Sequence, residues 1–234
     1  MNKGISDIEK FEVVRKLSNE WSKDRYGIPI MRPVTIDMID CDNIQAINFQ
    51  NLKIHENNLY KFVLNFRYDK NLDSQFWTHP LKEIPKLQSA MGAGTPDFSV
   101  SSRMMRPELI HQVFKNRWCG CLWQECNILA IPTMVWDGKD TYDICFGNIP
   151  KRNVVLISTL GCMNHSDIFL AGYYEMMRRI EPSLIFVYGS MIDGMYGKFI
   201  NFKYTEGFKT NYSQDIQLSL PLVTSRVFEK RRLA

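Results

Sequence analysis

The chain reads Val154-Val155-Leu156-Ile157-Ser158-Thr159 in one stretch and Leu184-Ile185-Phe186-Val187-Tyr188-Gly189 in a later one. Both stretches are continuous apolar runs that end in polar residues, which is typical of strands buried on both faces. Between them, Ser166 and Asp167 suit the start of a helix and Arg178 suits its last turn. The order strand, helix, strand indicates a mostly parallel α/β sheet.

Similar runs occur elsewhere in the chain. Ile128–Trp136 is a long apolar run, and Phe62–Phe66 and Pro96–Ser99 predict two earlier strands, with a last one at Ile216–Leu220. We therefore predict an α/β fold with a mostly parallel sheet of five or six strands, arranged as a partial barrel or an open doubly wound sheet, with an N-terminal helical extension.

The N-terminal part of the chain has a different pattern. Apolar residues at three- and four-residue steps predict an amphipathic helix over Asp7–Tyr26, and Ile30–Asn51 is expected to be irregular. We expect residues 1–60 to form a helical extension and an irregular segment packed on the main α/β domain, residues 61–234. The apolar stripe of this helix has three alternative roles: it packs on the sheet, forms a dimer interface or binds a partner protein. The stripe consists of Ile8, Phe11, Val14, Leu17 and Trp21.

Composition is that of a globular protein. The 234 residues are 45% hydrophobic and 23% charged, and the formal net charge of +4 is compatible with a nucleic-acid partner without requiring one. The six cysteines lie in apolar contexts, which indicates a reducing compartment. The first ten residues lack an apolar signal segment, and no apolar run reaches the roughly 20 residues of a membrane helix. We expect a cytoplasmic protein with no membrane partner; its oligomeric state stays open.

Polar residues at the ends of the predicted strands are the main site candidates. The carboxyl ends of parallel strands meet at one rim, so these residues should converge. Among them, Asp97 and Asp137 could hold Mg²⁺ or Mn²⁺ and support cleavage or transfer of a phosphate ester. The alternative is that both are turn residues, since Asp137-Gly138 is a turn dipeptide. The full strand-end set is Asp97, Asp137, Ser158, Thr159, Cys162 and Tyr188.

Two cysteine patterns have a chemical and a plainer interpretation. Cys162 precedes a predicted helix start, which would lower the pKa of its thiol, and His165 could act as its base in nucleophilic catalysis. A chance Cys–His pair explains the same spacing. The other pattern is a set of three cysteines near a histidine, which could bind zinc but better fits small apolar residues on a helix; it comprises His111, Cys119, Cys121 and Cys126.

Basic and aromatic residues are interleaved near the predicted rim. Arg103, Arg117 and Lys151 are expected to contact phosphate groups, with tryptophans available to stack on bases, as single-stranded nucleic acid requires. The alternative is that the tryptophans are core residues and the cations form an ordinary solvated face.

An ordered series of short blocks supports a family resemblance. The blocks include Thr-Pro-Asp-Phe-Ser at 95–99, Ile-Pro-Thr-Met-Val-Trp at 131–136, Cys-Phe-Gly-Asn-Ile-Pro-Lys at 145–151 and Phe-Val-Tyr-Gly at 186–189. This succession resembles the domain of unknown function 4417 family over roughly Phe62–Phe228. The resemblance implies a phage, plasmid or bacterial mobile-element origin and a single α/β domain, and it assigns no catalytic residue. For a protein already expected to be cytoplasmic, such an origin means an intracellular location in the host cell.

Two functional hypotheses follow from these patterns. The first is a mobile-element protein that acts on or binds nucleic acid or a nucleotide, with a metal-assisted phosphoester enzyme as its most specific form. The second is a non-catalytic interaction protein that binds and modulates a host protein, which the 12 methionines and the lack of a recognisable catalytic signature favour. Whether the protein is an enzyme is left undecided.

Overall fold

The described residues form eight strands in two four-stranded sheets. The computed structural model describes residues 15–204 and 215–219. The first sheet is parallel throughout and has the order β1 (Gln45–Asn48), β2 (Lys61–Leu64), β3 (Gly92–Gly94), β4 (Ala130–Ile131). The second has the order β5 (Val154–Ser158), β6 (Leu184–Tyr188), β7 (Gly197–Phe202), β8 (Asp215–Ser219), and its last strand is antiparallel.

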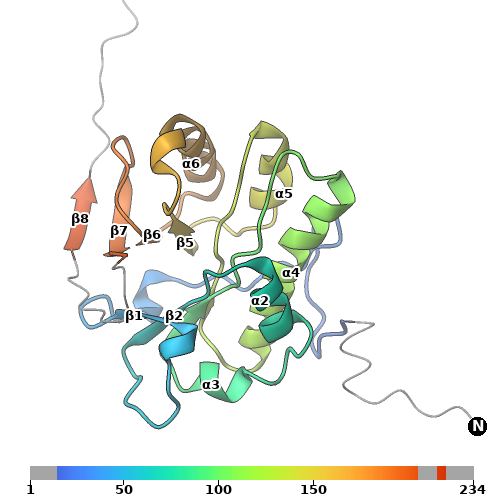
Figure 1. Cartoon of the computed structure of the whole chain (residues 1–234), viewed down its shortest axis with the longest axis vertical. Coiled ribbons are helices and arrows are strands. Elements are labelled where there is room, and N and C mark those ends of the chain that lie inside the picture. The colour runs from blue at the N-terminus through green and yellow to red at the C-terminus, as the bar shows by residue number, and fades with distance from the viewer. Residues whose placement is uncertain (1–14, 205–214, 220–234) are drawn as a thin grey trace, which may run out of the picture.

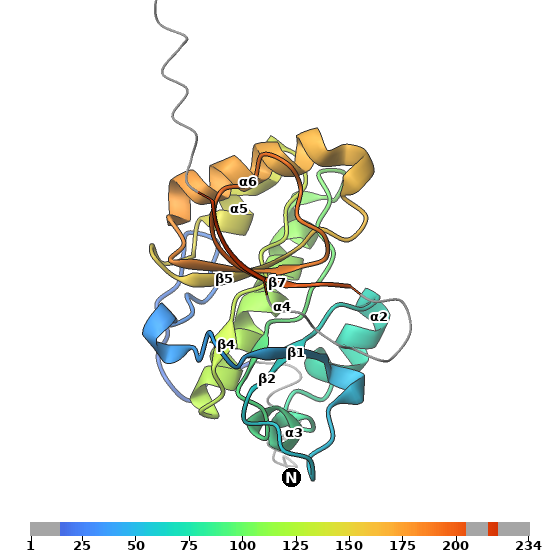
Figure 2. The same ribbon diagram turned by 90° about the vertical axis from the view of Figure 1, so that its left-hand side faces the viewer.

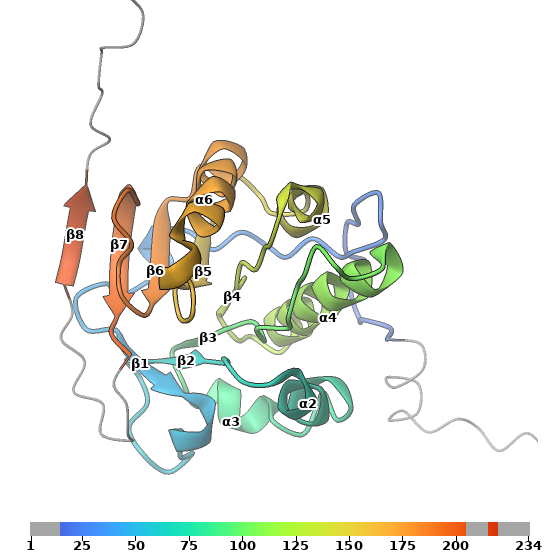
Figure 3. The same cartoon turned by 45° about the horizontal axis from the view of Figure 1, so that its top comes forward.

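A single parallel bridge joins the sheets between Thr133 and Leu156. Leu156 N donates to Pro132 O at 3.0 Å, and Met134 N donates to Leu156 O at 2.7 Å. The strands consequently follow one another along a curve from β1 to β8 (Figure 3). Within the described residues β1 pairs only with β2, so the curve stays open. This confirms the predicted α/β class and mostly parallel sheet, and the arrangement is the partial-barrel form.

The two sheets face each other across an apolar core. Phe62 of β2 lies edge-on to Phe186 of β6, with ring centroids 4.9 Å apart, and Phe186 packs on Phe202 of β7 at 5.3 Å. All three side chains are at most 1% exposed. Burying such a ring contributes about 1.5–3 kcal/mol, so this inner layer holds the curved sheets together.

Helices cover the outer faces. They are α2 (Asp69–Leu72), α3 (Ile84–Gln88), α4 (Arg106–Glu125), α5 (Tyr142–Phe146) and α6 (Ser166–Ile180). Short turns of helix complete the set: η1 (Ile36–Met38), η2 (Phe49–Asn51), η3 (Asp73–Trp77), η4 (Lys139–Thr141) and η5 (Met163–His165). Figures 1 and 2 show α5 and α6 beside the second sheet, and α2 and α3 beside the first. No helix of the described residues is long and apolar enough to cross a membrane.

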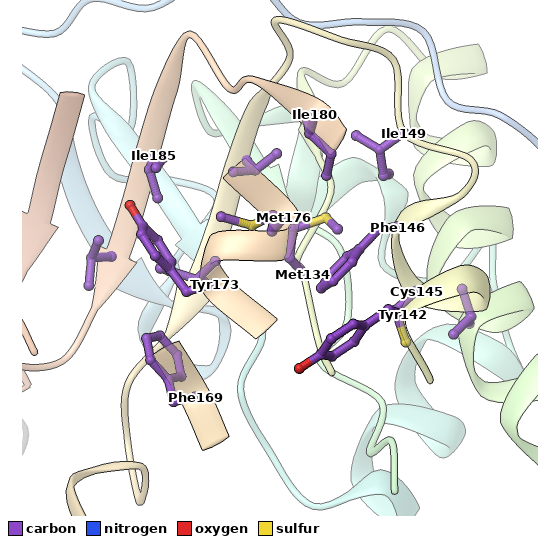
Figure 4. Close-up of a cluster of buried hydrophobic side chains, with 14 of the residues drawn as sticks. Met134, Tyr142, Cys145, Phe146, Ile149, Phe169, Tyr173, Met176, Ile180 and Ile185 are labelled. Atoms are coloured by element: carbon purple, nitrogen blue, oxygen red, sulfur yellow. The ribbon is translucent and has the colours of Figure 1, made fainter. Parts of the chain in front are cut away.

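A second core lies between α5, α6 and the outer face of the second sheet. Phe146 of α5 and Met176 of α6 point toward one another over Met134, which follows β4 (Figure 4). Phe169 and Tyr173 of α6 continue the layer, with parallel rings 6.1 Å apart. The amphipathic pattern of α6 is therefore explained by one face packing on the sheet.

The predicted helix over Asp7–Tyr26 is wrong for its described part. Residues 15–26 are not helical, and residues 7–14 lie outside the described residues. The carboxylate of Glu125, at the end of α4, accepts hydrogen bonds from the backbone N–H groups of Ser18 and Asn19 and from Trp21 Nε1. These bonds fix the segment in an irregular path, which side-chain periodicity does not reveal.

The expected strand at Pro96–Ser99 is also displaced. The strand is β3, Gly92–Gly94; residues 95–100 are not part of a strand, although Thr95 N still donates to Ile131 O and Asp97 N to Asn65 O. A Cβ on Gly94 would lie 2.3 Å from Leu156 Cδ2, so only glycine allows the sheets to approach there. Pro96 has no N–H to continue the ladder. Two strands, β1 and β7, were not predicted at all, which explains the low expected strand count.

Arg117 of α4 is a buried structural residue, 2% exposed. Its guanidinium donates to Cys145 O at 3.1 Å and Thr133 O at 3.3 Å and also to the side-chain oxygen of Asn116. Burial lowers its pKa to about 10. One side chain thus ties α4 to α5 and to the chain segment that follows β4.

Replacing Arg117 with methionine tests this role. Arg117→Met keeps the apolar stem but removes the donor to Cys145 O and one of the two donors to Thr133 O, so we expect the free energy of unfolding to fall by about 2–4 kcal/mol. Urea unfolding measures the change, with Arg103→Met, on an exposed arginine, as the control expected within about 0.5 kcal/mol of the wild type. Equal stability of the two variants would contradict the assignment.

Candidate functional site

A hollow of about 240 Å³ opens at the carboxyl ends of four neighbouring strands. Phe66 comes from the end of β2, Asp97 from the loop after β3, and Trp136 from the chain after β4. The end of β5 supplies Ser158, and Cys162 follows shortly after it. We call this hollow the rim pocket; Met134, Val135, Leu160 and Phe169 complete its lining. Its position is the one predicted for ligands of parallel α/β sheets.

Asp97 is the titratable group of the rim pocket. Its backbone N–H donates to Asn65 O at 3.1 Å, which fixes the loop, while no side-chain or backbone donor of the described residues bonds its carboxyl group. Burial, reinforced by the nearby Asp69 carboxylate, raises the pKa of Asp97 to about 7. At neutral pH this carboxyl group is therefore present both as an acid and as a carboxylate.

The acceptor capacity of Asp69 is used by the protein itself. Its Oδ1 accepts from Ser99 N at 3.0 Å and from Ser99 Oγ at 2.9 Å, and its Oδ2 accepts from Gln112 Nε2 at 3.2 Å. Asp69 therefore holds the loop that follows Asp97. Of the two neighbouring carboxyl groups, only that of Asp97 can still accept hydrogen bonds from a ligand at both of its oxygens.

Aromatic rings form two walls of the pocket. Phe66 stacks on Tyr188 with centroids 5.0 Å apart, and Trp136 packs against Phe169 at 5.1 Å. Trp136 Nε1 donates to Phe169 O at 3.3 Å, which fixes the indole plane. A Cβ on Gly172 of α6 would lie 2.1 Å from the Trp136 ring, so this glycine makes the space that the indole occupies.

Cys162 lies in the rim pocket, but its environment disfavours the thiolate. Burial and the Asp97 carboxylate raise the pKa of its thiol, whereas the sequence suggested lowering by the helix N-terminus. Its Sγ lies 3.7 Å from Leu160 O. Ser158 is half-buried beside it, and Ser158 Oγ accepts from Leu160 N at 3.2 Å. The hydroxyl proton of Ser158 has no bonded acceptor among the described residues.

Asp137 lines a neighbouring hollow of about 290 Å³ together with His165 and Gly161. Its carboxylate accepts from Ser102 N at 2.7 Å and Ser102 Oγ at 2.8 Å, and these bonds lower its pKa. Trp136, Cys162 and Phe169 line both hollows, so the hollows of Asp97 and Asp137 are adjacent. The pKa of Asp97 is raised, whereas that of Asp137 is lowered. Within residues 15–204, no three His, Cys, Asp or Glu side chains are grouped to hold a metal ion.

The other predicted site residues are dispersed. Thr159 and Tyr188 are at the rim but buried, and Thr159 Oγ1 donates to Ser190 O at 2.7 Å. Arg103 is exposed beside the Asp137 loop, and Arg117 lies in the core. Lys151 precedes β5, at the opposite end of the strand from the rim, and pairs with Glu181.

The cysteine cluster on α4 is part of the core. Cys119 and Cys121 are fully buried, and burial raises the pKa of both thiols. Cys119 Sγ points toward Phe76 O at 3.8 Å. These contacts support the interpretation of both residues as small apolar side chains.

Several rim residues escaped the sequence analysis. Phe66 and Arg67 follow β2 directly, and Lys203 follows β7. Arg67 and Lys203 are exposed. The rule that selected Asp97 would also have selected Arg67, because Phe62–Phe66 was a predicted strand; Lys203 was missed because β7 itself was missed.

The chain is similar to known phage proteins. It matches the family described as Domain of unknown function (DUF4417) over residues 21–205. The chain belongs to this family. The Gene 1 protein of Mycobacterium phage D29 is 31% identical over 189 residues, which cover 78% of this chain and 67% of the relative. The Gene 1 protein of Mycobacterium phage L5 is 30% identical over 188 residues, 78% of this chain and 79% of the relative. No solved structure matches the chain significantly.

The family match begins earlier and ends earlier than the resemblance suggested. Residue 21 lies well before Phe62, and residue 205 lies before Phe228. The family region thus includes β1 and the segment that passes Glu125, and it ends just after β7. The short strand blocks of the resemblance covered the middle of the family domain only.

The raised pKa of Asp97 predicts a pH-dependent loss of stability. Between its ordinary value of 3.8 and about 7, the folded protein keeps a proton that the unfolded chain releases, so stability falls as pH rises through this window. Asp97→Asn removes the effect and should gain stability relative to the wild type by roughly 3–4 kcal/mol at most between pH about 5 and about 8. Urea unfolding at several pH values measures this difference, with exposed Asp140→Asn as the control. A wild-type–variant difference independent of pH would contradict the raised pKa.

The packing of Trp136 gives a second prediction. Gly172→Ala places a methyl group where the indole lies, so Trp136 must shift and the free energy of unfolding should fall by about 1–3 kcal/mol. Near-UV circular dichroism reports the altered tryptophan environment. The exposed neighbour provides the control, Ala171→Ser, which should change neither quantity. An unaltered spectrum with full stability in Gly172→Ala would show that Trp136 is not held there.

Proposed function

We propose that this protein binds a nucleotide or single-stranded nucleic acid at the rim pocket, with a base held between aromatic walls and hydrogen-bonded to Asp97. The observation that carries the proposal is the Asp97 carboxyl group, which lies in a strand-end hollow without a donor from the described residues. A half-buried acid in that state favours a ligand that brings its own N–H groups. Nucleobases supply such groups together with a flat face for stacking.

Charge around the pocket supports the same ligand class. Arg67 follows Phe66 at the rim, Arg103 lies beside the Asp137 loop, and Lys203 follows β7; all three are exposed. Cations near the strand ends that carry an aromatic pocket fit a phosphate backbone that passes along the rim.

Metal-assisted phosphoester chemistry is the more specific form of this proposal, and the two candidate ligands support it less. Asp97 has its pKa raised to about 7, so its carboxylate form is only partly populated at neutral pH. Asp137 already accepts three hydrogen bonds from Ser101 and Ser102. Binding is therefore proposed first, and hydrolysis with Mg²⁺ or Mn²⁺ is measured alongside it.

A host-protein interaction is the second candidate, and exposed apolar residues favour it. Leu160 is 40% exposed, Met163 58% and Ile168 46%; Leu160 lines the rim pocket, Ile168 lines the neighbouring hollow, and Met163 follows Cys162, which lines both. Such side chains are frequent in protein interfaces. If this candidate holds, Asp97→Asn should leave the biological effect intact, whereas changes at Met163 and Ile168 should abolish it.

Binding of a labelled single-stranded oligonucleotide tests the leading proposal. Fluorescence anisotropy at low salt should detect binding that weakens as salt rises. Phe66→Leu keeps the wall apolar but removes a stacking ring, and should weaken binding about tenfold, since a stacked base is worth about 1–3 kcal/mol. Lys151→Gln, at the opposite end of β5, is the control and should bind like the wild type.

Two outcomes would end the proposal. The first is absence of binding by the wild type to oligonucleotides and mononucleotides at low salt. The second is binding by Phe66→Leu that equals the wild type while Lys151→Gln binds poorly, which would move the contact surface to the other end of the sheet. Release of products with Mg²⁺ or Mn²⁺ in the same samples would establish the catalytic form.

A further inference from the structure

We infer that the base taken by the rim pocket is guanine, recognised through its two adjacent N–H donors by the carboxylate of Asp97. This inference rests on the proposed nucleotide or nucleic-acid binding and names the ligand of the same site. It follows from the donors and acceptors that the pocket offers, which differ from those of a pocket suited to the other bases.

With Asp97 in its carboxylate form, the pocket presents one double acceptor and one hydroxyl donor. Asp97 has two carboxylate oxygens with no donor from the described residues. Ser158 accepts the N–H of Leu160, so its own hydroxyl proton is left to donate. The thiol of Cys162 is directed to Leu160 O and is only a weak partner for a ligand. A ligand that matches these polar groups therefore carries two hydrogen-bond donors next to one acceptor.

Guanine carries that pattern on its Watson–Crick edge. Its N1–H and N2–H₂ groups lie side by side and can donate in parallel to one carboxylate, as an arginine fork does, and its O6 can accept from the Ser158 hydroxyl. Adenine and cytosine place a ring-nitrogen acceptor beside their amino group, and uracil and thymine flank one N–H with two carbonyls. Each of these puts an acceptor against an oxygen of the Asp97 carboxylate.

Burial makes the mismatch costly. A carboxylate removed from water needs charge-assisted hydrogen bonds, and Asp69 beside it adds repulsion. Two donors from one ligand neutralise this cost more completely than a single donor does. The aromatic walls, Phe66 and Trp136, accept any flat base, so they supply affinity without discrimination. Asp97 and Ser158 therefore determine which base the pocket prefers.

The inference is tested with free nucleoside monophosphates by calorimetry at a pH of about 8 or above, where Asp97, with its pKa raised to about 7, is mostly a carboxylate. Wild-type protein should bind guanosine monophosphate at least tenfold more tightly than the adenosine, cytidine and uridine forms. Inosine monophosphate lacks the N2 amino group and should lose about tenfold relative to guanosine. The matched variant is Asp97→Asn, whose amide offers one acceptor and one donor in the same shape.

Asp97→Asn should transfer the preference to xanthosine monophosphate. Xanthine keeps N1–H but carries a carbonyl at C2, which accepts from the new amide N–H group. Because this is a gain of binding, a misfolded variant cannot produce it. The control is exposed Asp193→Asn, which lies outside both hollows and should keep the wild-type order of affinities.

The remaining outcomes separate the inference from the proposed function. Equal affinity for all monophosphates, or tighter binding of adenosine or cytidine, overturns the guanine assignment and leaves base binding in place. Failure of every nucleotide and oligonucleotide to bind overturns both. Free arginine that displaces guanosine monophosphate at equal or lower concentration would show that the pocket selects a guanidinium group of a protein partner, which also overturns the inference.

Discussion

The structure depends on how the two sheets are joined at Thr133. Thr133 N donates to Thr95 Oγ1 at 2.8 Å, and Thr133 Oγ1 donates to Thr95 O at 2.5 Å, which locks the chain after β4 to the chain after β3. Asn116 and Arg117 of α4 bond the same carbonyl oxygen of Thr133. The bridge to Leu156 then attaches β5. Thr95, Thr133 and Leu156 are thus fixed relative to one another. Two or three positions after each of them comes a rim residue, namely Asp97, Trp136 or Ser158. The geometry of the rim pocket therefore depends on this buried polar network.

Patterns set by local chemistry were readable from the sequence. The strands β5 and β6 and the helix α6 appear where continuous apolar runs, acidic first turns and basic last turns place them. The rule that parallel strands gather polar residues at one edge located Asp97, Ser158 and Cys162 in one pocket. These features depend on neighbours along the chain or on a general property of parallel sheets, and neither requires knowledge of distant contacts.

Features set by distant partners were not readable. The sequence predicts that Arg117 contacts phosphate, but in the structure its side chain lies in the core, where it donates hydrogen bonds to the carbonyl oxygens of residues 133 and 145. Glu125 holds the segment around Ser18 in a non-helical path, against its apolar periodicity. The strand β1 has only four residues and becomes a strand because β2 lies beside it. In each case a partner far along the chain decides the outcome.

Asp97 and Asp137 show why residue type alone does not define a site. Both are aspartates that follow strands, and the sequence gives no reason to separate them. Ser101 and Ser102 donate hydrogen bonds to the carboxylate of Asp137, and these bonds lower the pKa of Asp137. The Asp137 carboxylate therefore holds this loop in place. Asp97 is half-buried without such donors, and its pKa is raised to about 7, a state that lowers the stability of the folded protein at neutral pH. A carboxyl group without protein donors, next to an open hollow, is the kind of group that a ligand with its own N–H donors can bond, and on this ground Asp97, rather than Asp137, is the centre of the proposed site.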